Sequence, residues 1–161
     1  YVTRAVVKMM SAEQILDAIS SATGVSEKFR GYPLGTRATQ LAEGAVDHNF
    51  LKAFTKPVRD VRCDCARETD PTLNQVVHLM NNAGILDRCD VATSRLGRML
   101  ESKVATDEII EVMYLATLSR RPSAAERKLA GDHVSSLPER ALGLRDIQHA
   151  LINSNEFLLR H

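Results

Sequence analysis

Two capping boxes, each followed by an amphipathic run, constrain the fold of this chain more than any other feature of its sequence. In a capping box, a serine side chain binds the backbone N–H three residues ahead, and a glutamine or glutamate there bonds back to the serine backbone. Ser11–Gln14 and Ser123–Glu126 both have this pattern. After the first box, apolar residues at positions 15, 16, 19 and 22 form one helical stripe, and Gly24 is expected to end the helix.

Further helix signals follow along the chain. Asp70-Pro71 predicts a helix start, with the helix ending at residues 81–84, and a shorter helix is expected over residues 93–102. Thr106 is the expected N-cap of the next helix, and Pro138 precedes a last one whose apolar pattern extends to residue 158. No segment alternates with period 2, so the sequence predicts an all-α orthogonal bundle of five to six helices. The expected core includes Leu16, Ile19, Leu73, Val77, Leu79, Ile110, Tyr114, Leu118, Leu151 and Phe157.

Two segments, residues 25–46 and 55–69, show no helical period, with a short helix expected between them over residues 47–54. The first contains glycines and a proline spaced for turns, together with apolar residues that are expected to pack. We therefore expect a long ordered loop across the helices. Arg37 lies in this loop, and its five N–H donors suit the carbonyls of an irregular backbone, so we predict that it is buried and structural.

The size and charge of the chain exclude several classes of protein. Its 161 residues suit one helical domain over 1–161, and a net charge of +1 with 44% hydrophobic residues does not fit a disordered chain. The near-neutral charge argues against a nucleic-acid binder, and no apolar run is long enough to span a membrane. The first residues have neither an initiator Met nor a signal peptide, so we expect an excised or mature piece.

The densest polar cluster is Arg59, Arg62, Cys63, Cys65 and Arg67, directly before the predicted helix start at Asp70-Pro71. Cationic neighbours and a helix N-terminus both stabilise a thiolate. A disulfide in this short spacing would be strained and reducible, which favours redox activity. The alternative is that both cysteines are small buried residues that fix the loop, with the arginines solvated or paired.

A third interpretation of Cys63 and Cys65 is a metal site, completed by His48, His78 or Cys89. Against it, the histidines form no H-x-x-x-H pair, and His78 is better explained as a hydrogen-bonded side chain on a helix. The chain also lacks a C-x-x-C-H haem attachment motif, a G-x-S-x-G motif and a P-loop. The sequence thus predicts no cofactor and no catalytic residue outside the cysteine pair.

Residues 106–136 read as helix, turn, helix, which is also the pattern of a DNA-binding helix-turn-helix. The second helix begins Ser-Ala-Ala-Glu-Arg-Lys, which offers few side chains that read bases. An ordinary antiparallel helical hairpin is the favoured interpretation.

Several strings of the sequence are familiar together. They are S-A-E-Q-I-L-D-A at 11–18, G-Y-P-L-G-T-R-A at 31–38, C-D-C-A-R at 63–67, D-P-T-L-N-Q at 70–75, H-L-M-N at 78–81, Y-L-A-T-L-S-R-R-P at 114–122 and L-I-N-S-N-E-F-L at 151–158. Together they resemble the C-terminal domain of unknown function of large planctomycete surface or secreted proteins. There, this domain typically follows a cytochrome-c-like domain and another planctomycete-specific domain. Ala66 and Asn82 depart from the family pattern, where an acidic residue and a glycine are usual.

The resemblance implies that the chain is the C-terminal portion of an exported multidomain protein at the cell surface, in the periplasm or secreted. We expect a non-catalytic module that docks to neighbouring domains, among them a cytochrome-c-like domain. Because exported thiols tend to oxidise, we also predict a Cys63–Cys65 disulfide, with Arg62 and Arg67 favouring the thiolate after reduction and Cys89 left single. A thiol-redox or metal-binding module and a nucleic-acid binder are the alternatives.

Overall fold

The computed structural model describes residues 8–41, 48, 50–51, 83–90 and 92–160, and over these ranges the chain is mostly helical, which confirms the all-α prediction. In chain order the elements are β1 (Lys8–Met9), α1 (Ala12–Thr23), the 3-10 helix η1 (Ala38–Gln40), α4 (Ala83–Asp90), α5 (Arg95–Glu101), α6 (Thr106–Leu118), α7 (Ala124–Ser136), α8 (Arg140–Ile152), α9 (Asn155–Leu158) and β2 (Leu159–Arg160). Residues 50 and 51 are also helical, within the short helix predicted over residues 47–54.

Both predicted capping boxes are present. Gln14 N donates to Ser11 Oγ at 3.3 Å and Ser11 N donates to Gln14 Oε1 at 3.0 Å, and Ser123 and Glu126 form the same reciprocal pair at the start of α7. Gly24 ends α1 with φ +70°, a left-handed conformation that glycine adopts without strain. The predicted apolar stripe of α1 is buried: Ile15, Leu16, Ile19 and Ala22.

Three helix boundaries differ from the prediction. The N-cap of α6 is Ala105 rather than Thr106, because Ala105 keeps an extended backbone and its carbonyl accepts from Ile109 N. The last helix does not run through to residue 158. The side chains of Asn153 and Ser154 bond to carbonyls of the preceding turn, and Ser154 Oγ then accepts from Phe157 N to start α9.

The third difference concerns residues 83–90, where a helix was expected to have just ended. They form α4, with Gly84 inside it. Ile85 and Cys89, one turn apart, are 3% and 2% exposed and pack into the core around α1. Burial of this pair outweighs the turn tendency of the glycine.

Two hydrophobic clusters hold the elements together. The α1 cluster consists of Ile15, Leu16, Ile19, Ala22, Phe29, Ala38, Phe50, Ile85, Cys89, Ile152 and Phe157. The α6 cluster consists of Leu96, Ile109, Ile110, Met113, Tyr114, Ala130, Val134, Leu144, Ile147 and Leu151. Helices α6 and α8 lie side by side, α7 lies across one end of them, and Leu118 packs against both clusters.

The expected core is largely correct. Six of its members are buried, namely Leu16, Ile19, Ile110, Tyr114, Leu151 and Phe157. Leu118 is half-buried where the two clusters meet, and Leu73, Val77 and Leu79 lie outside the described residues.

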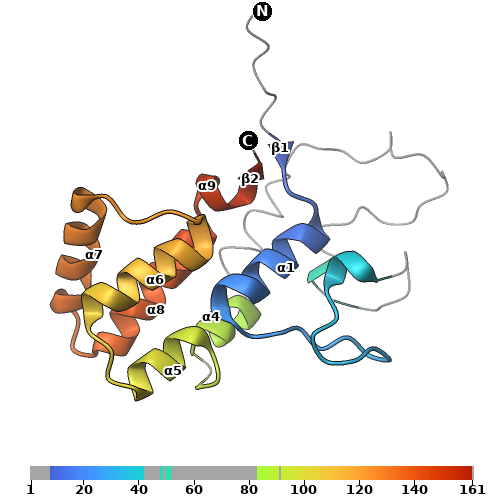
Figure 1. The fold of residues 1–161 in the computed structure, drawn as a ribbon, viewed down its shortest axis with the longest axis horizontal. Helices are drawn as coiled ribbons and strands as arrows, with labels where there is room; N and C mark the ends of the chain where they lie inside the picture. The colour runs from blue at the N-terminus through green and yellow to red at the C-terminus, as the bar shows by residue number, and fades with distance from the viewer. Residues whose placement is uncertain (1–7, 42–47, 49, 52–82, 91, 161) are drawn as a thin grey trace, which may run out of the picture.

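The chain between α1 and η1 follows an irregular path on one side of α1. Gly31 and Gly35 adopt φ values of +86° and +90°, which let the chain turn back toward α1. At the other end of the described chain, β1 pairs antiparallel with β2, Lys8 opposite Arg160 and Met9 opposite Leu159. This pairing brings residues 8–10 and 158–160 side by side (Figure 1).

Candidate functional site

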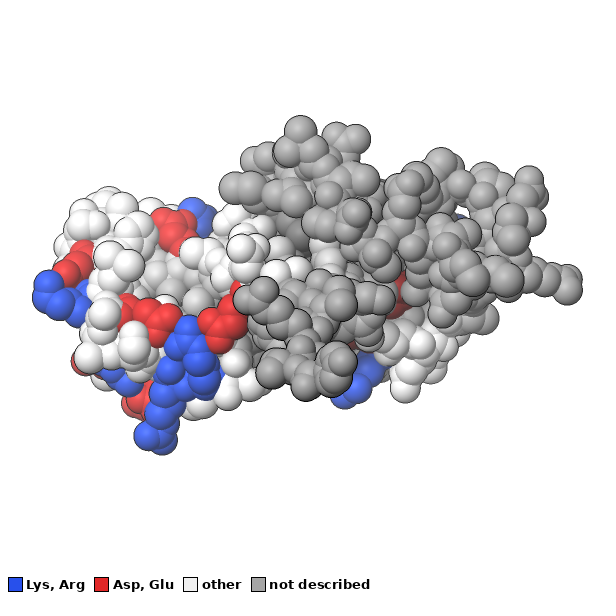
Figure 2. Space-filling model, turned by 90° about the horizontal axis from the view of Figure 1, so that it is seen from above, with Lys and Arg blue, Asp and Glu red and all other residues white. Residues whose placement is uncertain are grey.

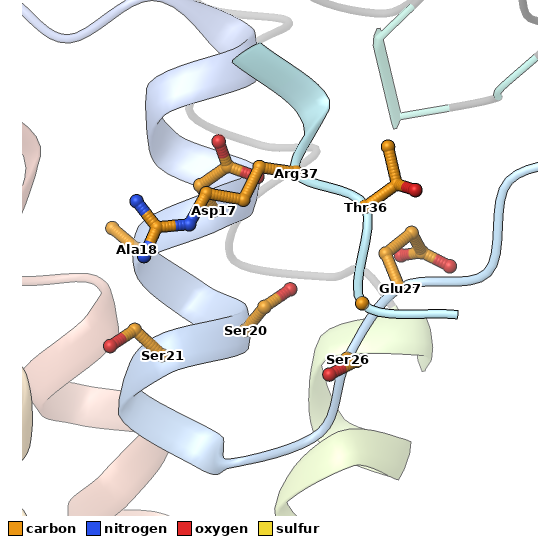
Figure 3. Close-up of a pocket in the computed structure, with 9 residues that line it drawn as sticks. Asp17, Ala18, Ser20, Ser21, Ser26, Glu27, Thr36 and Arg37 are labelled. Atoms are coloured by element: carbon orange, nitrogen blue, oxygen red, sulfur yellow. The ribbon is translucent and has the colours of Figure 1, made fainter. Parts of the chain in front are cut away.

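A cavity of about 410 Å³ lies between α1 and the irregular segment that follows it (Figure 3). Polar side chains dominate its wall. Those used below are Asp17, Ser20 and Ser21 from α1, and Ser26, Glu27 and Arg37 from the segment that follows α1. The cavity is open on one side, so small solutes can reach these groups.

Asp17 fixes one rim of the cavity. Its Oδ1 accepts from Ala38 N at 2.6 Å, and its Oδ2 accepts from Thr39 N at 3.1 Å and from Thr39 Oγ1 at 2.8 Å. One carboxylate thus caps η1 and holds the end of the loop against α1. Asp17 is a positioning group whose acceptor oxygens are already engaged.

Glu27 fixes the other rim through an ion pair with Arg88 of α4. Arg88 Nη1 also donates to Ser20 Oγ at 3.2 Å, so the guanidinium joins α1, α4 and the loop. His48 is also close to the Glu27 carboxylate, with its Nε2 3.5 Å from Glu27 Oε2. The centroids of the His48 and Phe29 rings are 5.6 Å apart. Burial lowers the pKa of His48 below its usual value, which keeps the imidazole neutral near pH 7.

Arg37 does not occupy the place predicted for it. The prediction of a buried, structural arginine is wrong, because the residue is exposed. Its guanidinium forms no hydrogen bond or ion pair with any part of the chain that the structure describes. Arg37 is held through its backbone instead: its N–H donates to Gln40 Oε1 at 3.0 Å, and its carbonyl accepts from Gln40 N at 3.0 Å. The physical reason is that Asp17 and Gln40 already bind the backbone N–H groups of residues 37–39, so the turn does not need the arginine side chain.

The predicted cysteine site lies outside the described residues. Cys63, Cys65, Arg62, Arg67 and His78 all fall in this stretch, so the disulfide, redox and metal interpretations stay predictions. Over the described ranges, no group of three or more His, Cys, Asp or Glu side chains could hold a metal ion.

The third cysteine, Cys89, is described, and it is a free thiol buried in the α1 cluster. Burial raises its pKa to about 12. Since the thiolate is the reactive form, this thiol is inert in the folded chain at neutral pH.

Helices α6 and α7 correspond to the segment for which the sequence left a DNA-binding helix-turn-helix as an alternative. In the first turns of α7, Arg127 Nη2 binds Glu111 Oε2 at 2.8 Å and Nη1 binds the carbonyl of Asp107, both on α6. Ala130 and Val134 of α7 point into the α6 cluster. On the described surface in Figure 2, acidic and basic side chains lie next to one another instead of forming a basic face. This geometry is that of a packed helical hairpin.

Sequence reasoning missed a second polar cluster, formed around Arg120 after α6. Its Nε and Nη2 donate to Glu156 at 2.6 and 2.8 Å, and its Nη1 and Nη2 donate to Glu126 at 2.9 and 2.7 Å. With a further bond from Nη1 to the Arg121 carbonyl at 3.3 Å, all five N–H donors are used. The guanidinium also lies 5.5 Å from the ring centroid of Tyr114. Hydrogen bonds from Arg120 hold the pKa of Glu126 at about 2.

We call this the Arg120 clamp, and it joins the α6–α7 turn to α9. It connects two of the family-like strings, S-R-R-P at 119–122 and N-S-N-E-F at 153–157. Only the presence of charged residues in both strings could have pointed to it, because one sequence does not reveal which distant residues pair.

Comparison with known proteins identifies a family but no biochemical activity. The model of the PSD1 family, described as a protein of unknown function (DUF1553), matches residues 1–134. No curated protein and no solved structure gives a significant match. Over the described residues, no helix has both the length and the apolar character needed to cross a bilayer.

Proposed function

The chain belongs to the PSD1 family of proteins of unknown function, and we propose that it acts there as a non-catalytic helical module that docks against neighbouring domains. The setting that we propose is an exported multidomain protein of planctomycete type, at the cell surface, in the periplasm or secreted. A cytochrome-c-like domain is the proposed neighbour.

The observation that carries this proposal is the pairing of β1 with β2. Met10 N donates to the carbonyl of Leu158 at 3.0 Å, and the two strands continue the pairing to Lys8 and Arg160. The pairing fixes residues 8–10 and 158–160 as one edge against which a neighbouring domain can pack.

The Arg120 clamp supports the same role. Its donors bind Glu126 and Glu156, so this strong charge cluster holds helices in place at the end of the molecule where α9 and β2 lie. A turn and a helix held together in this way beside the β1–β2 pair suit a module whose task is to fix the position of its neighbours.

Cross-linking of the full-length polypeptide tests the proposal. We expect lysine-reactive cross-links from the neighbouring domain to Lys8 on β1, with Lys128 on α7 as the matched control, because α7 lies at the far end of the α6 cluster (Figure 1). Docking also stabilises both partners, so the module should melt at a higher temperature in the full polypeptide than alone. Equal cross-linking of both lysines with an unchanged melting temperature contradicts docking.

Thiol titration distinguishes the thiol-redox alternative from the docking role. Because Cys89 is buried with a pKa of about 12, labelling of the folded chain reports on Cys63 and Cys65 alone. One label per unreduced, denatured chain supports the predicted disulfide, whereas three labels exclude it. Gain of two native labels after mild reduction, with oxidation of a dithiol substrate by the unreduced protein, supports redox activity instead of docking.

A further inference from the structure

We infer that the cavity beside α1 is a binding site for a carboxylate group, which Arg37 and the neighbouring serine hydroxyls hold. This inference goes beyond the docking role and does not depend on it. It follows from which polar groups around the cavity are already bonded and which are not.

Arg37 is the arginine that lines the cavity, and its guanidinium is not bonded within the described chain. Arginines packed against α1 elsewhere are bonded: Arg88 to Glu27, Arg95 to the carbonyls of Ser21 and Ala22 at 3.0 and 3.3 Å, and Arg98 to the Thr93 carbonyl. The Arg37 guanidinium has five donors and no partner in the described chain. Figure 3 shows its side chain extending back across α1, over Asp17 and Ala18.

The backbone that carries Arg37 is fixed in advance. The N–H groups of the three consecutive residues 37–39 are bound by the side chains of Gln40 and Asp17. A charged side chain on an immobilised backbone loses less conformational freedom when a ligand binds, which favours affinity.

Hydroxyl groups supply further donors in the cavity. Ser21 and Ser26 line it, and neither hydroxyl has a hydrogen-bond partner among the residues that the structure describes. Ser20 is different, because its Oγ donates to the Leu16 carbonyl at 2.9 Å and accepts from Arg88. Two hydroxyls and one guanidinium therefore stay available to the oxygen atoms of a ligand.

The charges of the cavity favour a carboxylate over a phosphate. A guanidinium matches the two coplanar oxygens of a carboxylate with two parallel hydrogen bonds. Asp17 and Glu27 also line the cavity, and their negative charges repel a dianion more than a monoanion. A volume of about 410 Å³ is large enough for a small organic acid or for an acidic side chain with its flanking backbone.

The carboxylate has two conceivable sources, a glutamate or aspartate in a polypeptide segment and a free sugar acid. Titrations of the 161-residue chain with an acetylated, amidated Gly-Glu-Gly peptide and with glucuronate distinguish them. Gly-Gln-Gly, glucose and inorganic phosphate are the uncharged and dianionic controls. Binding is followed by NMR shifts of the amides of residues 21, 26 and 37.

We expect saturable shifts at these three amides with at least one of the two carboxylates, and weaker or no binding of the controls. Arg37→Gln should weaken binding at least about tenfold, since a charge-assisted pair is lost. Arg37→Lys keeps the charge without the two-pronged geometry and should recover only part of the affinity. Arg30→Gln is the matched control, because Arg30 is exposed on the same loop but does not line the cavity.

The outcomes decide the inference. Tighter binding of the peptide assigns the site to a protein segment, and tighter binding of glucuronate assigns it to a free acid. Absence of saturable shifts with both carboxylates overturns the inference, as does equal binding of the uncharged analogues, tighter binding of phosphate, or an equal loss in Arg37→Gln and Arg30→Gln. Unchanged melting temperatures of the variants ensure that any loss reflects binding.

Discussion

The α6 cluster and the α1 cluster differ in how their polar groups are used. In the α6 cluster, helices joined by short turns bury a continuous apolar core, and Gln148 Nε2 donates to Thr117 Oγ1 at 3.0 Å inside it. The Arg120 clamp closes its end with all five donors bonded. The α1 cluster instead carries a long irregular segment, which Asp17 and Glu27 hold by single side chains.

This difference suggests separate roles for the two regions, stability for the α6 cluster and ligand binding for the α1 side. Where helices pack against one another, charged groups find partners within the chain. Where the backbone is irregular, side chains are needed to bind backbone N–H groups, and Arg37 is left without a partner beside a cavity. We therefore expect the α6 cluster to dominate global stability and the α1 side to open locally and to bind ligands.

The largest expected effect tests the first half of this comparison. Leu144 is fully buried in the α6 cluster, so Leu144→Ala should lower the free energy of unfolding by about 2–5 kcal/mol through lost burial and a residual cavity. Leu129→Ala is the control, since Leu129 is 73% exposed and should change stability little. Urea denaturation measures both. Equal effects of the two variants would show that α8 does not anchor this core.

A second substitution tests how closely α7 and α8 approach. A Cβ at Gly143 would lie 2.8 Å from the Val134 Cα, a backbone atom that cannot move aside without shifting α7. Gly143→Ala should therefore cost about 1–3 kcal/mol by overpacking. Gly131 is also helical but has open space around it, so Gly131→Ala should stabilise the chain by about 0.5–1 kcal/mol. Thermal denaturation that gives both changes the same sign would contradict this packing.

The Arg120 clamp predicts a smaller, pH-dependent effect. The pKa of Glu126 is about 2 in the folded chain against about 4.3 in an unfolded one, so its contribution is present above about pH 4.3 and is lost as the pH falls toward 2. Glu126→Gln keeps the capping bond from Ser123 but removes the charge. The melting temperature of the variant should lie below that of the native chain at pH 7, and the difference should vanish near pH 2. A difference that stays constant with pH would show that the charge of Glu126 does not stabilise the fold.

The parts of the fold that the sequence predicted are those fixed by local chemistry. The capping boxes at Ser11 and Ser123, the stripe of α1 and the left-handed Gly24 depend on residues within a turn or two of each other. Helix α4 was not predicted, because its two inward residues are stabilised by packing against α1, more than sixty positions away. Local turn signals at 81–84 gave no hint of that burial.

The candidate site shows the same limit more strongly. The sequence pointed to Cys63 and Cys65, which lie outside the described residues, and it placed Arg37 in the interior. What it could not show is that Asp17, twenty-one residues before Ala38, binds the loop backbone and so frees the Arg37 side chain. Donor counts indicate what a side chain can bind, but its partners depend on distant residues.

The Asp17 contact predicts a local effect on the α1 side. Asp17→Asn keeps one acceptor oxygen and cannot bind both N–H groups of η1, so the cost should be about 1 kcal/mol and confined to the loop. Hydrogen exchange should accelerate at the amides of Ala38 and Thr39 while the amides of α6 and α8 stay protected. Equal acceleration in α6 would show that the loop and the α6 cluster unfold together and would remove the distinction between the two regions.

The smallest change in stability is expected at Arg37. This prediction bears directly on the proposal that the cavity beside α1 binds a ligand. Arg37 is exposed and its side chain bonds to nothing in the described chain, so Arg37→Ala should leave the melting temperature unchanged within about 1 °C. Arg95 is the matched comparison, because its guanidinium caps the C-terminal carbonyls of α1, and Arg95→Ala should lower the melting temperature measurably. A drop for Arg37→Ala as large as for Arg95→Ala would mean that Arg37 stabilises the loop, in which case its charge would not be free for a ligand and the carboxylate site would lose its main residue. If Arg37→Ala leaves the melting temperature unchanged while Arg95→Ala lowers it, Arg37 does not stabilise the fold. That result agrees with a role for the Arg37 charge in binding a ligand.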